Sequence, residues 1–196
     1  MINLLEDCEL VALSSEQLII DFNCGDEDLN DFFNHDAINY QNQLLGQAYF
    51  FRLLKTGKVV CAFSLSADSI KTFLLPNSRR KKVKDCIPHQ KSLNSYPSLL
   101  IGRFGVAVEF EGQSIGSHLI EFVKDYSLAA FPNISRFLVV DAYNSPAVLK
   151  FYQKNEFTFV FSTEEQEREY LKRSPDESII LRTRLMFYDM INWKNE

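Results

Sequence analysis

The sequence contains few glycines, few cysteines and no long hydrophobic run. Only seven of its 196 residues are glycine, which is about half of the usual share. Four of the seven lie within one short window: Gly102, Gly105, Gly112 and Gly116. Glycine is required where the backbone bends unusually or lets a ligand approach closely. This window is therefore the first candidate for a functional site.

The cysteines are widely spaced and form no Cys-x-x-Cys motif; they are Cys8, Cys24, Cys61 and Cys86. This spacing favours reduced, buried thiols over a zinc site or disulfides. The apolar runs are shorter than the roughly 20 residues of a membrane helix. The first seven residues lack the basic start and the long apolar stretch of a signal peptide. We therefore expect a cytoplasmic protein with no metal and no membrane association.

Basic residues are absent from the first quarter of the chain. Residues 1–51 carry ten acidic side chains and no Lys or Arg, whereas the remainder carries 21 basic and 16 acidic ones. The positive excess falls in residues 77–91, which hold Arg79, Arg80, Lys81, Lys82, Lys84 and Lys91. Such a run is either a solvated loop or a surface for nucleic acid or cofactor phosphates. The acidic segment either caps helices and aids solubility or docks a basic segment of a partner.

The order of apolar patterns predicts an α/β fold. Hydrophobic residues at 46% and charged residues at 24% are ordinary for a globular chain, and the length fits one domain. Spacing predicts helices at 27–44, 114–130, from Pro146 onward and, charged and mostly exposed, at 163–173. It predicts strands at 8–13, 48–54, 59–65, 99–108, 137–140, 157–161 and 179–187. Residues 70–97 read as a long irregular connection. We expect one mixed sheet with helices on both faces.

The glycine window contains a candidate phosphate-binding loop. A helix is predicted to start shortly after the buried strand at 99–108. The turn before this helix and its first residues are Glu111, Gly112, Gln113, Ser114, Ile115, Gly116 and Ser117. The N–H groups of a helix's first turn have no internal partner and lie at its positive end. They form a ready site for phosphate. Tight packing of the helix on the strand would explain one or two of the glycines equally well.

A second block follows the pattern strand, Asn turn, helix, strand over residues 139–157. Together the two blocks resemble the GNAT superfamily of N-acetyltransferases. The first is similar to its pyrophosphate loop, Q/R-x-x-G-x-G/A, with Glu111 at the first position and Ser114 at the central glycine. The second is similar to its N-x-x-A-x-x-F-Y-x-x-x-G-F segment, with Asn144, Ala147, Phe151, Tyr152 and Phe157 in place and Glu156 at the glycine.

The sequence resembles one branch of the superfamily more closely than the others. The run from Phe22 to Gly25, followed by Leu29, Phe32 and Ala37, looks like the branch's opening motif, and Ile101 to Val106 looks like its L-G-R-L-A-V strand. Arg79-Arg80 also has a counterpart there. This branch comprises toxins of toxin–antitoxin modules that acetylate the amino group of aminoacyl-tRNA.

The resemblance implies a central mixed sheet of six to seven strands in a single N-acetyltransferase domain over residues 1–196. Its parts would be an N-terminal strand and acidic helix at 1–47, a hairpin at 48–69 and a basic loop at 70–97. An acetyl-CoA-binding core at 98–162 and a C-terminal helix and strand at 163–190 would follow.

The resemblance also implies roles for individual residues. Acetyl-CoA would be the acetyl donor and a primary amine the acceptor. The backbone of Phe104 and Val106 would hold pantetheine, Asn144 would bond near its amides, and the loop from Glu111 to Ser117 would bind the diphosphate. Tyr152 would protonate the leaving thiolate. Arg79, Arg80, Lys81, Lys82 and Arg103 would meet charged tRNA or cofactor phosphates. No motif places a general base, although Glu109, Glu111 and Asp141 lie nearby in sequence.

Three functions remain open at this stage. The leading one is a toxin-type acetyltransferase acting on charged tRNA, with an antitoxin protein and a second copy of the chain as possible partners. The second is an ordinary GNAT enzyme that acetylates a small-molecule or protein amine. The third is a non-catalytic CoA-binding or antitoxin-binding module, which the departures at Glu111 and Ser114 suggest.

Overall fold

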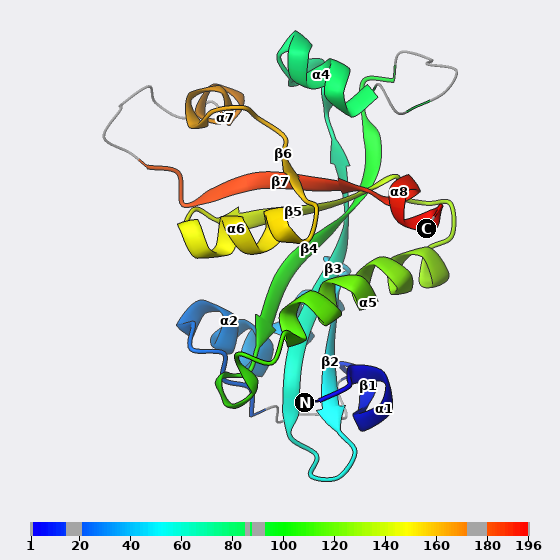
Figure 1. Cartoon of the computed structure of the whole chain (residues 1–196), viewed down its shortest axis with the longest axis vertical. Coiled ribbons are helices and arrows are strands. Elements are labelled where there is room, and N and C mark those ends of the chain that lie inside the picture. The colour runs from blue at the N-terminus through cyan, green and yellow to red at the C-terminus, as the bar shows by residue number, and fades with distance from the viewer. Residues whose placement is uncertain (1, 15–20, 85–86, 88–92, 172–179, 196) are drawn as a thin grey trace. The chain divides into compact units, whose positions relative to one another are not determined.

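A computed structural model of the chain describes residues 2–14, 21–84, 87, 93–171 and 180–195. Within them, seven strands form one open sheet in the order β1-β2-β3-β4-β5-β7-β6 (Figure 1). The predicted α/β class with a mixed sheet is thereby confirmed. The chain divides into two compact units, Met1–Ala67 with Ile101–Ser127 and Asp68–Leu100 with Leu128–Glu196.

The first unit is built on an antiparallel meander. In it β1 (Cys8–Ala12) pairs with β2 (Gln47–Leu53), and β2 pairs with β3 (Val59–Ile70) across the predicted turn. Helix α5 (Ile115–Ala130) lays Phe122 against Phe51, with ring centroids 4.8 Å apart, and Tyr126 against Tyr49 at 5.1 Å. These aromatic pairs fill the core of the first unit, in a chain with 17 Phe and eight Tyr residues.

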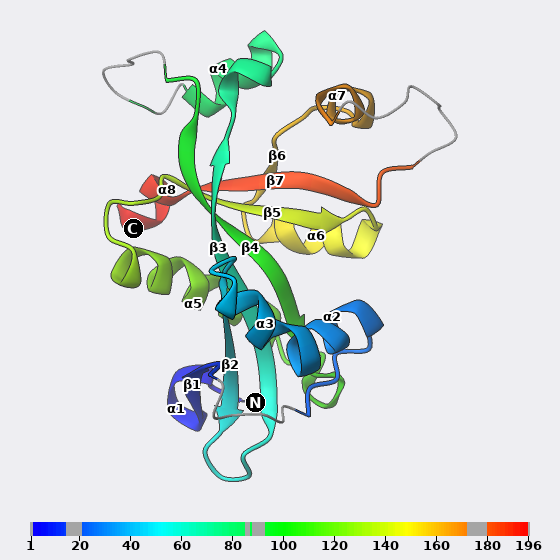
Figure 2. The ribbon, with the colours of Figure 1, turned by 180° about the vertical axis from the view of Figure 1, so that it is seen from behind.

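The predicted acidic helix is present, but its middle is a π-helical segment. It runs as α2 (Glu27–Asp31), the π segment η1 (Phe32–Asp36) and α3 (Ala37–Asn42), and α2 and α3 are seen in Figure 2. Asp26 caps it, because its carboxylate accepts from the Leu29 N–H at 3.0 Å.

This helix ends two residues earlier than predicted. Leu44, the last residue of the predicted range, adopts φ +59° and is 93% exposed, so the helix does not extend to it. The N–H groups of Leu44 and Leu45 turn back onto the carbonyls of Gln41 and Tyr40. These two bonds satisfy the last carbonyls of the helix and end it.

The second unit is built on β5 (Phe137–Tyr143), which pairs antiparallel with β7 (Thr183–Asp189); β6 (Thr158–Phe159) pairs with the other side of β7. Helix α6 (Pro146–Lys154) contacts β5 and α7 (Glu164–Tyr170) contacts β7. Two short helices, α1 (Leu4–Asp7) in the first unit and α8 (Met190–Lys194) in the second, were not predicted. Strand β4 (Tyr96–Val106) has its first residues in the second unit and its last in the first.

The predicted irregular connection at 70–97 is in fact partly helical. It contains the 3₁₀ turn η2 (Thr72–Leu74) and helix α4 (Asn77–Lys84), which carries the basic run. The helix begins where the N–H groups of Arg79 and Arg80 bond the Pro76 carbonyl. Because Val83 is its only buried residue, α4 has no apolar periodicity that a sequence pattern could detect.

Smaller differences concern the C-terminal elements. The strand expected at 157–161 is reduced to β6, and the final strand begins at Thr183. The predicted start of that strand at 179 and the predicted end of the charged helix at 172–173 lie outside the described residues. That helix was expected to be mostly exposed, yet Glu167 on it is buried.

The state of the cysteines, membrane-spanning helices and metal-ligand clusters can be described only for the residues that the structure describes. There, Cys8, Cys24 and Cys61 are free thiols, while Cys86 lies outside it. No helix that the structure describes is long and apolar enough to span a bilayer. Nor do the described residues gather three or more His, Cys, Asp or Glu side chains as metal ligands.

Candidate active site

In the first unit, the loop between β4 and α5 presents a row of unbonded N–H groups. Gly112 adopts φ +75°, and a Cβ placed on it would meet no atom within 4 Å. The N–H groups of Gly112, Gln113 and Ser114 donate to no acceptor among the described residues. They lead directly into the first turn of α5, the positive end of that helix. The loop therefore forms an open cradle that suits an anion.

The two positions where the chain departs from the glycines of the GNAT pattern keep a glycine-like backbone. Ser114 adopts φ +61° and Glu156 adopts φ +71°. A residue with a Cβ in this region costs about 1–2 kcal/mol. Ser114 nevertheless starts α5, because its carbonyl accepts from the N–H groups of Ser117 and His118. The substitutions thus preserve the path of the chain at some cost in stability.

The acidic residues beside the loop face solvent. Glu111 is exposed, and its charge contributes, after burial and the charge of Asp26, to raising the pKa of the Cys24 thiol. Both carboxylate oxygens of Glu109 bond Lys58 Nζ, at 2.7 and 2.8 Å. Glu109 is therefore engaged in an ion pair, which disfavours it as a general base.

Close packing within the same unit explains the glycine at position 105. A Cβ there would lie 3.2 Å from both Cys24 Sγ and Phe22 Cζ. The opening motif of residues 22–25 therefore packs directly on β4. On the same strand, the exposed Arg103 donates to the Gly102 carbonyl at 2.8 Å, and its Cζ lies 5.0 Å from the centre of the Phe32 ring. Phe104 and Val106 are half-buried on this strand.

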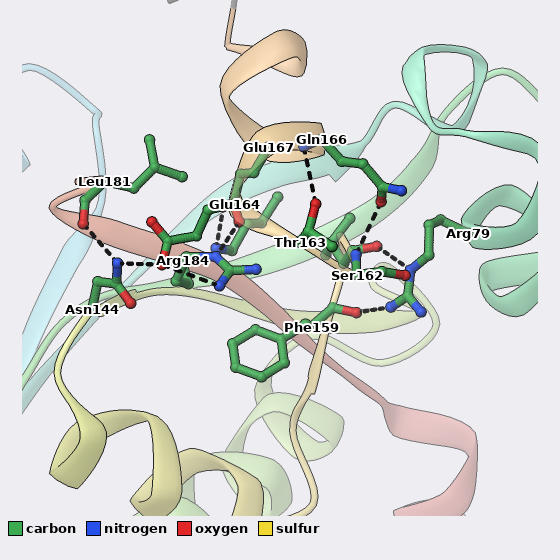
Figure 3. Close-up of polar contacts among 12 residues, drawn as sticks. Arg79, Asn144, Phe159, Ser162, Thr163, Glu164, Gln166, Glu167, Leu181 and Arg184 are labelled. Carbon is green, nitrogen blue, oxygen red and sulfur yellow. Dashed lines mark hydrogen bonds and ion pairs between the residues drawn. The ribbon is translucent and has the colours of Figure 1, made fainter. Parts of the chain in front are cut away.

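In the second unit, Asn144 stands between the end of β5 and the start of α6. Its Nδ2 donates to the Leu181 carbonyl at 2.9 Å and to Glu164 Oε1 at 3.1 Å (Figure 3). Its backbone N–H bonds the Arg182 carbonyl. The next residue, Ser145, caps α6 by accepting from the Val148 N–H, with Pro146 in the first turn as predicted.

Tyr152 is buried on α6, with 5% of its surface exposed. Its ring makes edge contacts with Phe151 and Phe157, at centroid distances of 5.1 and 5.4 Å. Burial raises the pKa of Tyr152 far above its ordinary value of 10. The phenol therefore keeps its proton at neutral pH, as a general acid must.

Four basic residues of α4 were predicted to contact tRNA or cofactor phosphates, and their surroundings differ. Arg79 donates through Nε to the Val160 carbonyl at 2.7 Å and through Nη2 to the Phe159 carbonyl (Figure 3), and burial lowers its pKa. Arg80 bonds the carbonyls of Thr72, Phe73 and Leu75. Lys81 and Lys82, in contrast, are exposed. The arginines tie α4 to the unit, and the lysines present charge to solvent.

Sequence reasoning missed a buried ion pair in the second unit. Arg184 Nε lies 2.6 Å from Glu167 Oε2, and Glu167 Oε1 accepts from the Leu185 N–H at 2.6 Å. Arg184 also lies 3.9 Å from Glu164 and stacks over the Phe159 ring. The available signal was an arginine inside an apolar strand, which requires a buried partner.

Asp141 on β5 is a second titratable group near the same network. Its side chain is exposed, yet partial desolvation by its neighbours raises its pKa, and the negative charge of Asp68 raises it further. Its charge also contributes to the raised pKa values of Glu167 and Tyr170. The sequence-predicted residues are thus divided: the loop and Arg103 lie in the first unit, and Asn144, Tyr152 and the α4 residues lie in the second.

Comparison with protein-family models identifies the class. Residues 3–157 match the Acetyltransferase (GNAT) family. Because this match covers most of the chain, the chain belongs to the GNAT family and is an acetyltransferase that uses acetyl-CoA.

Solved structures with the same fold include several toxins of toxin–antitoxin systems. A tyrosine-to-phenylalanine mutant of KacT has a TM-score of 0.70 and 19% identity, with 97% of this chain and 99% of that chain covered. AtaT complexed with acetyl-methionyl-tRNAfMet has a TM-score of 0.67 and 19% identity, covering 96% and 98%. AtaTR bound with acetyl-CoA has a TM-score of 0.65 and 18% identity, covering 97% and 98%. A search of curated protein sequences found no match.

Proposed function

We propose that this chain transfers the acetyl group of acetyl-CoA to the α-amino group of an aminoacyl-tRNA. The observation that carries the donor half is the row of unbonded N–H groups from Gly112 to Ser114 at the start of α5. The acceptor half is supported by the likeness to AtaT, whose structure was solved with acetyl-methionyl-tRNAfMet.

Acetyl-CoA, when bound, supplies an acetyl group already activated as a thioester. The N–H groups of Gly112, Gln113, Ser114, Ile115 and Gly116 would hold its diphosphate, because they combine free donors with the positive end of α5. Ser117 would follow them on the first turn. The backbone of Phe104 and Val106 would hold the pantetheine arm, and the Val106 N–H would polarise the thioester carbonyl.

Tyr152 Oη would hold the proton that the departing thiolate requires. Its burial keeps the phenol protonated, and proton transfer from a positioned acid contributes about 10²–10⁴-fold to a rate. The amine of an aminoacyl ester is less basic than that of a free amino acid, so a fraction is unprotonated and nucleophilic at neutral pH. A dedicated base is then unnecessary, which agrees with the engagement of Glu109 by Lys58.

The acceptor RNA would meet the exposed lysines of α4, Lys81 and Lys82, and the exposed Arg103. Arg79 and Arg80 would contribute indirectly, by fixing α4 through backbone carbonyls. The acidic residues of 1–51 would dock a basic segment of an antitoxin, since AtaT was solved bound to the C-terminus of AtaR. A homodimer in the cytoplasm completes the proposal.

A second candidate is acetylation of a small-molecule or protein amine. It is favoured by the commitment of Arg79 and Arg80 to carbonyls, which reduces the positive charge available to RNA. In this case the lysines of α4 would be an ordinary solvated face.

The deciding experiment incubates the protein with acetyl-CoA and total charged tRNA and analyses the tRNA 3′ ends by mass spectrometry. We expect N-acetyl-aminoacyl adenosine, and growth arrest on expression that Tyr152→Phe relieves. Acetylation of polyamines or peptides with unmodified tRNA would support the second candidate. Normal growth with a protein that binds acetyl-CoA and modifies no tRNA would contradict the first.

A further inference from the structure

Among the described residues, the carboxamide of Asn144 has both donors occupied, while its acceptor Oδ1 has no partner. An Asn side chain offers two N–H donors and one carbonyl acceptor. Both partners of Nδ2, the Leu181 carbonyl and Glu164 Oε1, are acceptors, so the side-chain nitrogen must face them. This assigns the orientation of the amide from chemistry. A ligand at Asn144 can therefore meet only Oδ1, and must itself donate.

Glu164 is held in place by the local structure of α7. It is the first residue of that helix, after Thr163, whose Oγ1 accepts from the Gln166 N–H. Gln166 Oε1 in turn accepts from the Ser162 N–H, a variant of the capping box (Figure 3). A carboxylate at this end of a helix is also favoured by the helix dipole.

A buried cation fixes Glu164 from the other side. Arg184 Nη1 lies 3.9 Å from Glu164 Oε1, and the same guanidinium is bonded to Glu167 at 2.6 Å. Arg184 is 7% exposed and Glu167 is 3% exposed. Glu167 is tied to the backbone N–H of Leu185. A continuous polar chain therefore runs from β7 through Arg184 and Glu164 to Asn144 (Figure 3).

We propose that Glu164 is a positioning residue, which fixes the Asn144 carboxamide so that Oδ1 accepts a hydrogen bond from an amide N–H of the pantetheine arm. This inference rests on the proposed function, in which the chain binds acetyl-CoA. Without Glu164 the carboxamide is held by Leu181 alone and can rotate. It then presents N–H groups to a ligand N–H, so an attraction is replaced by a repulsion for part of the time.

The test compares two ligands that differ in the pantetheine arm: coenzyme A, and 3′-phosphoadenosine 5′-diphosphate, which lacks it. Calorimetry would measure both against wild type, Glu164→Ala and Glu164→Gln. We expect Glu164→Ala to weaken coenzyme A binding about three- to tenfold, the worth of one hydrogen bond. Binding of the shorter ligand should change less than about twofold. Glu164→Gln should recover most of the loss, because the Gln carbonyl can still accept from Asn144.

Two controls separate positioning from stability. Glu165→Ala removes a charge from the neighbouring, exposed position of α7 and should leave both affinities unchanged. In an Asn144→Ala background, Glu164→Ala should have no further effect on coenzyme A, because the group it positions is absent. An additive loss in that background would overturn the proposal.

Other outcomes are equally decisive. An unchanged affinity of Glu164→Ala for coenzyme A would overturn the proposal, as would an equal loss for both ligands with a lowered melting temperature. If the wild-type protein bound neither ligand, the donor site itself would be contradicted and the positioning role would fall with it.

Discussion

Arg184 Nε lies 2.6 Å from Glu167 Oε2, and both side chains are more than nine-tenths buried. The pair joins α7 to β7 in a unit where no other ion pair has both partners so deeply buried among the described residues. Burial raises the pKa of Glu167 and outweighs the opposite effects of Arg184 and the Leu185 N–H. The main energetic consequence of this ion pair is therefore the cost of removing one of its two partners.

Removing one partner of this pair should destabilise the protein strongly. Glu167→Ala leaves the buried Arg184 charge with only the more distant Glu164, 3.9 Å away, as a counter-charge. We expect a loss of about 3–5 kcal/mol in the free energy of unfolding. Urea denaturation measures it, with the exposed Glu165→Ala as control. The double variant Arg184→Met, Glu167→Leu should lose much less. A double variant as unstable as Glu167→Ala would contradict this explanation.

Asp141 should make stability depend on pH. Its side chain is exposed, but partial desolvation by neighbouring atoms and the charge of Asp68 raise its pKa in the folded chain above its ordinary value of 3.8. The carboxyl thus contributes its full stability below pH 3.8, and that contribution is lost as the pH rises through the folded value. Asp141→Asn should therefore gain stability relative to wild type as the pH rises from 3.8 through the folded value, and by a small amount because the side chain is exposed. Urea unfolding at several pH values would show it. A stability difference that stays constant over this pH range would contradict the prediction.

Gly112→Ala should separate backbone strain from ligand binding. At φ +75° an alanine costs about 1–2 kcal/mol of stability, and no neighbouring atom adds a clash. Gly57 is a matched control, because it has φ +72° and equally open surroundings in the β2–β3 turn. Both variants should lose similar stability, but only Gly112→Ala should also weaken acetyl-CoA binding in calorimetry. Equal affinities would argue against the loop as the diphosphate site.

Tyr152→Phe should lower turnover without lowering affinity for acetyl-CoA. The variant removes only Oη from a ring that stays packed between Phe151 and Phe157. We expect kcat to fall about 10²–10⁴-fold, with the melting temperature and the CoA dissociation constant nearly unchanged. Because burial raises the pKa of the phenol, wild-type activity should show no loss from Tyr152 ionisation below pH 10. An active Phe variant would remove Tyr152 from the chemistry.

The lysines and arginines of α4 should behave differently in tRNA binding. Lys81→Gln with Lys82→Gln should weaken binding and reduce the slope of log affinity against log salt by about 2, one for each phosphate that a lysine no longer neutralises. Stability should be unchanged, because both side chains are exposed. Arg79→Gln should instead lower stability, since its guanidinium bonds two carbonyls of the β6 region. An unchanged salt slope in the double lysine variant would favour a non-RNA substrate.

The sequence predicted those elements whose residues are buried with a regular period. Strand β5 and helices α5 and α6 agree with expectation, because continuous apolar runs and helical spacing directly reflect a buried environment. Helix α4 was missed because only Val83 on it is buried. The left-handed conformations of Ser114 and Glu156 were not predicted, and the only hint of them was the glycine that the GNAT pattern has at each position.

The sequence suggests the candidate site through its motifs, but it does not predict the contacts that support those residues. Asn144 and Tyr152 stand in a local pattern that a sequence displays. The pairing of Asn144 with Glu164, and of Arg184 with Glu167, joins residues about 20 positions apart. Such pairs depend on which strands become neighbours, and no local pattern encodes that choice. The same reason explains why Arg79 was expected to contact RNA, whereas its guanidinium bonds the carbonyls of Phe159 and Val160.

The π-helical segment Phe32–Asp36 has a consequence for comparing this chain with its relatives. A π turn holds one more residue than an α turn, so the residues before and after it follow two different helical registers. Its first two residues, Phe32 and Phe33, are both buried although they are adjacent. Aligning the chain with a relative whose helix is regular throughout therefore requires a one-residue gap between Phe32 and Asp36. Without that gap, every position from Glu27 to Asp31 would be matched to the wrong side of the relative's helix.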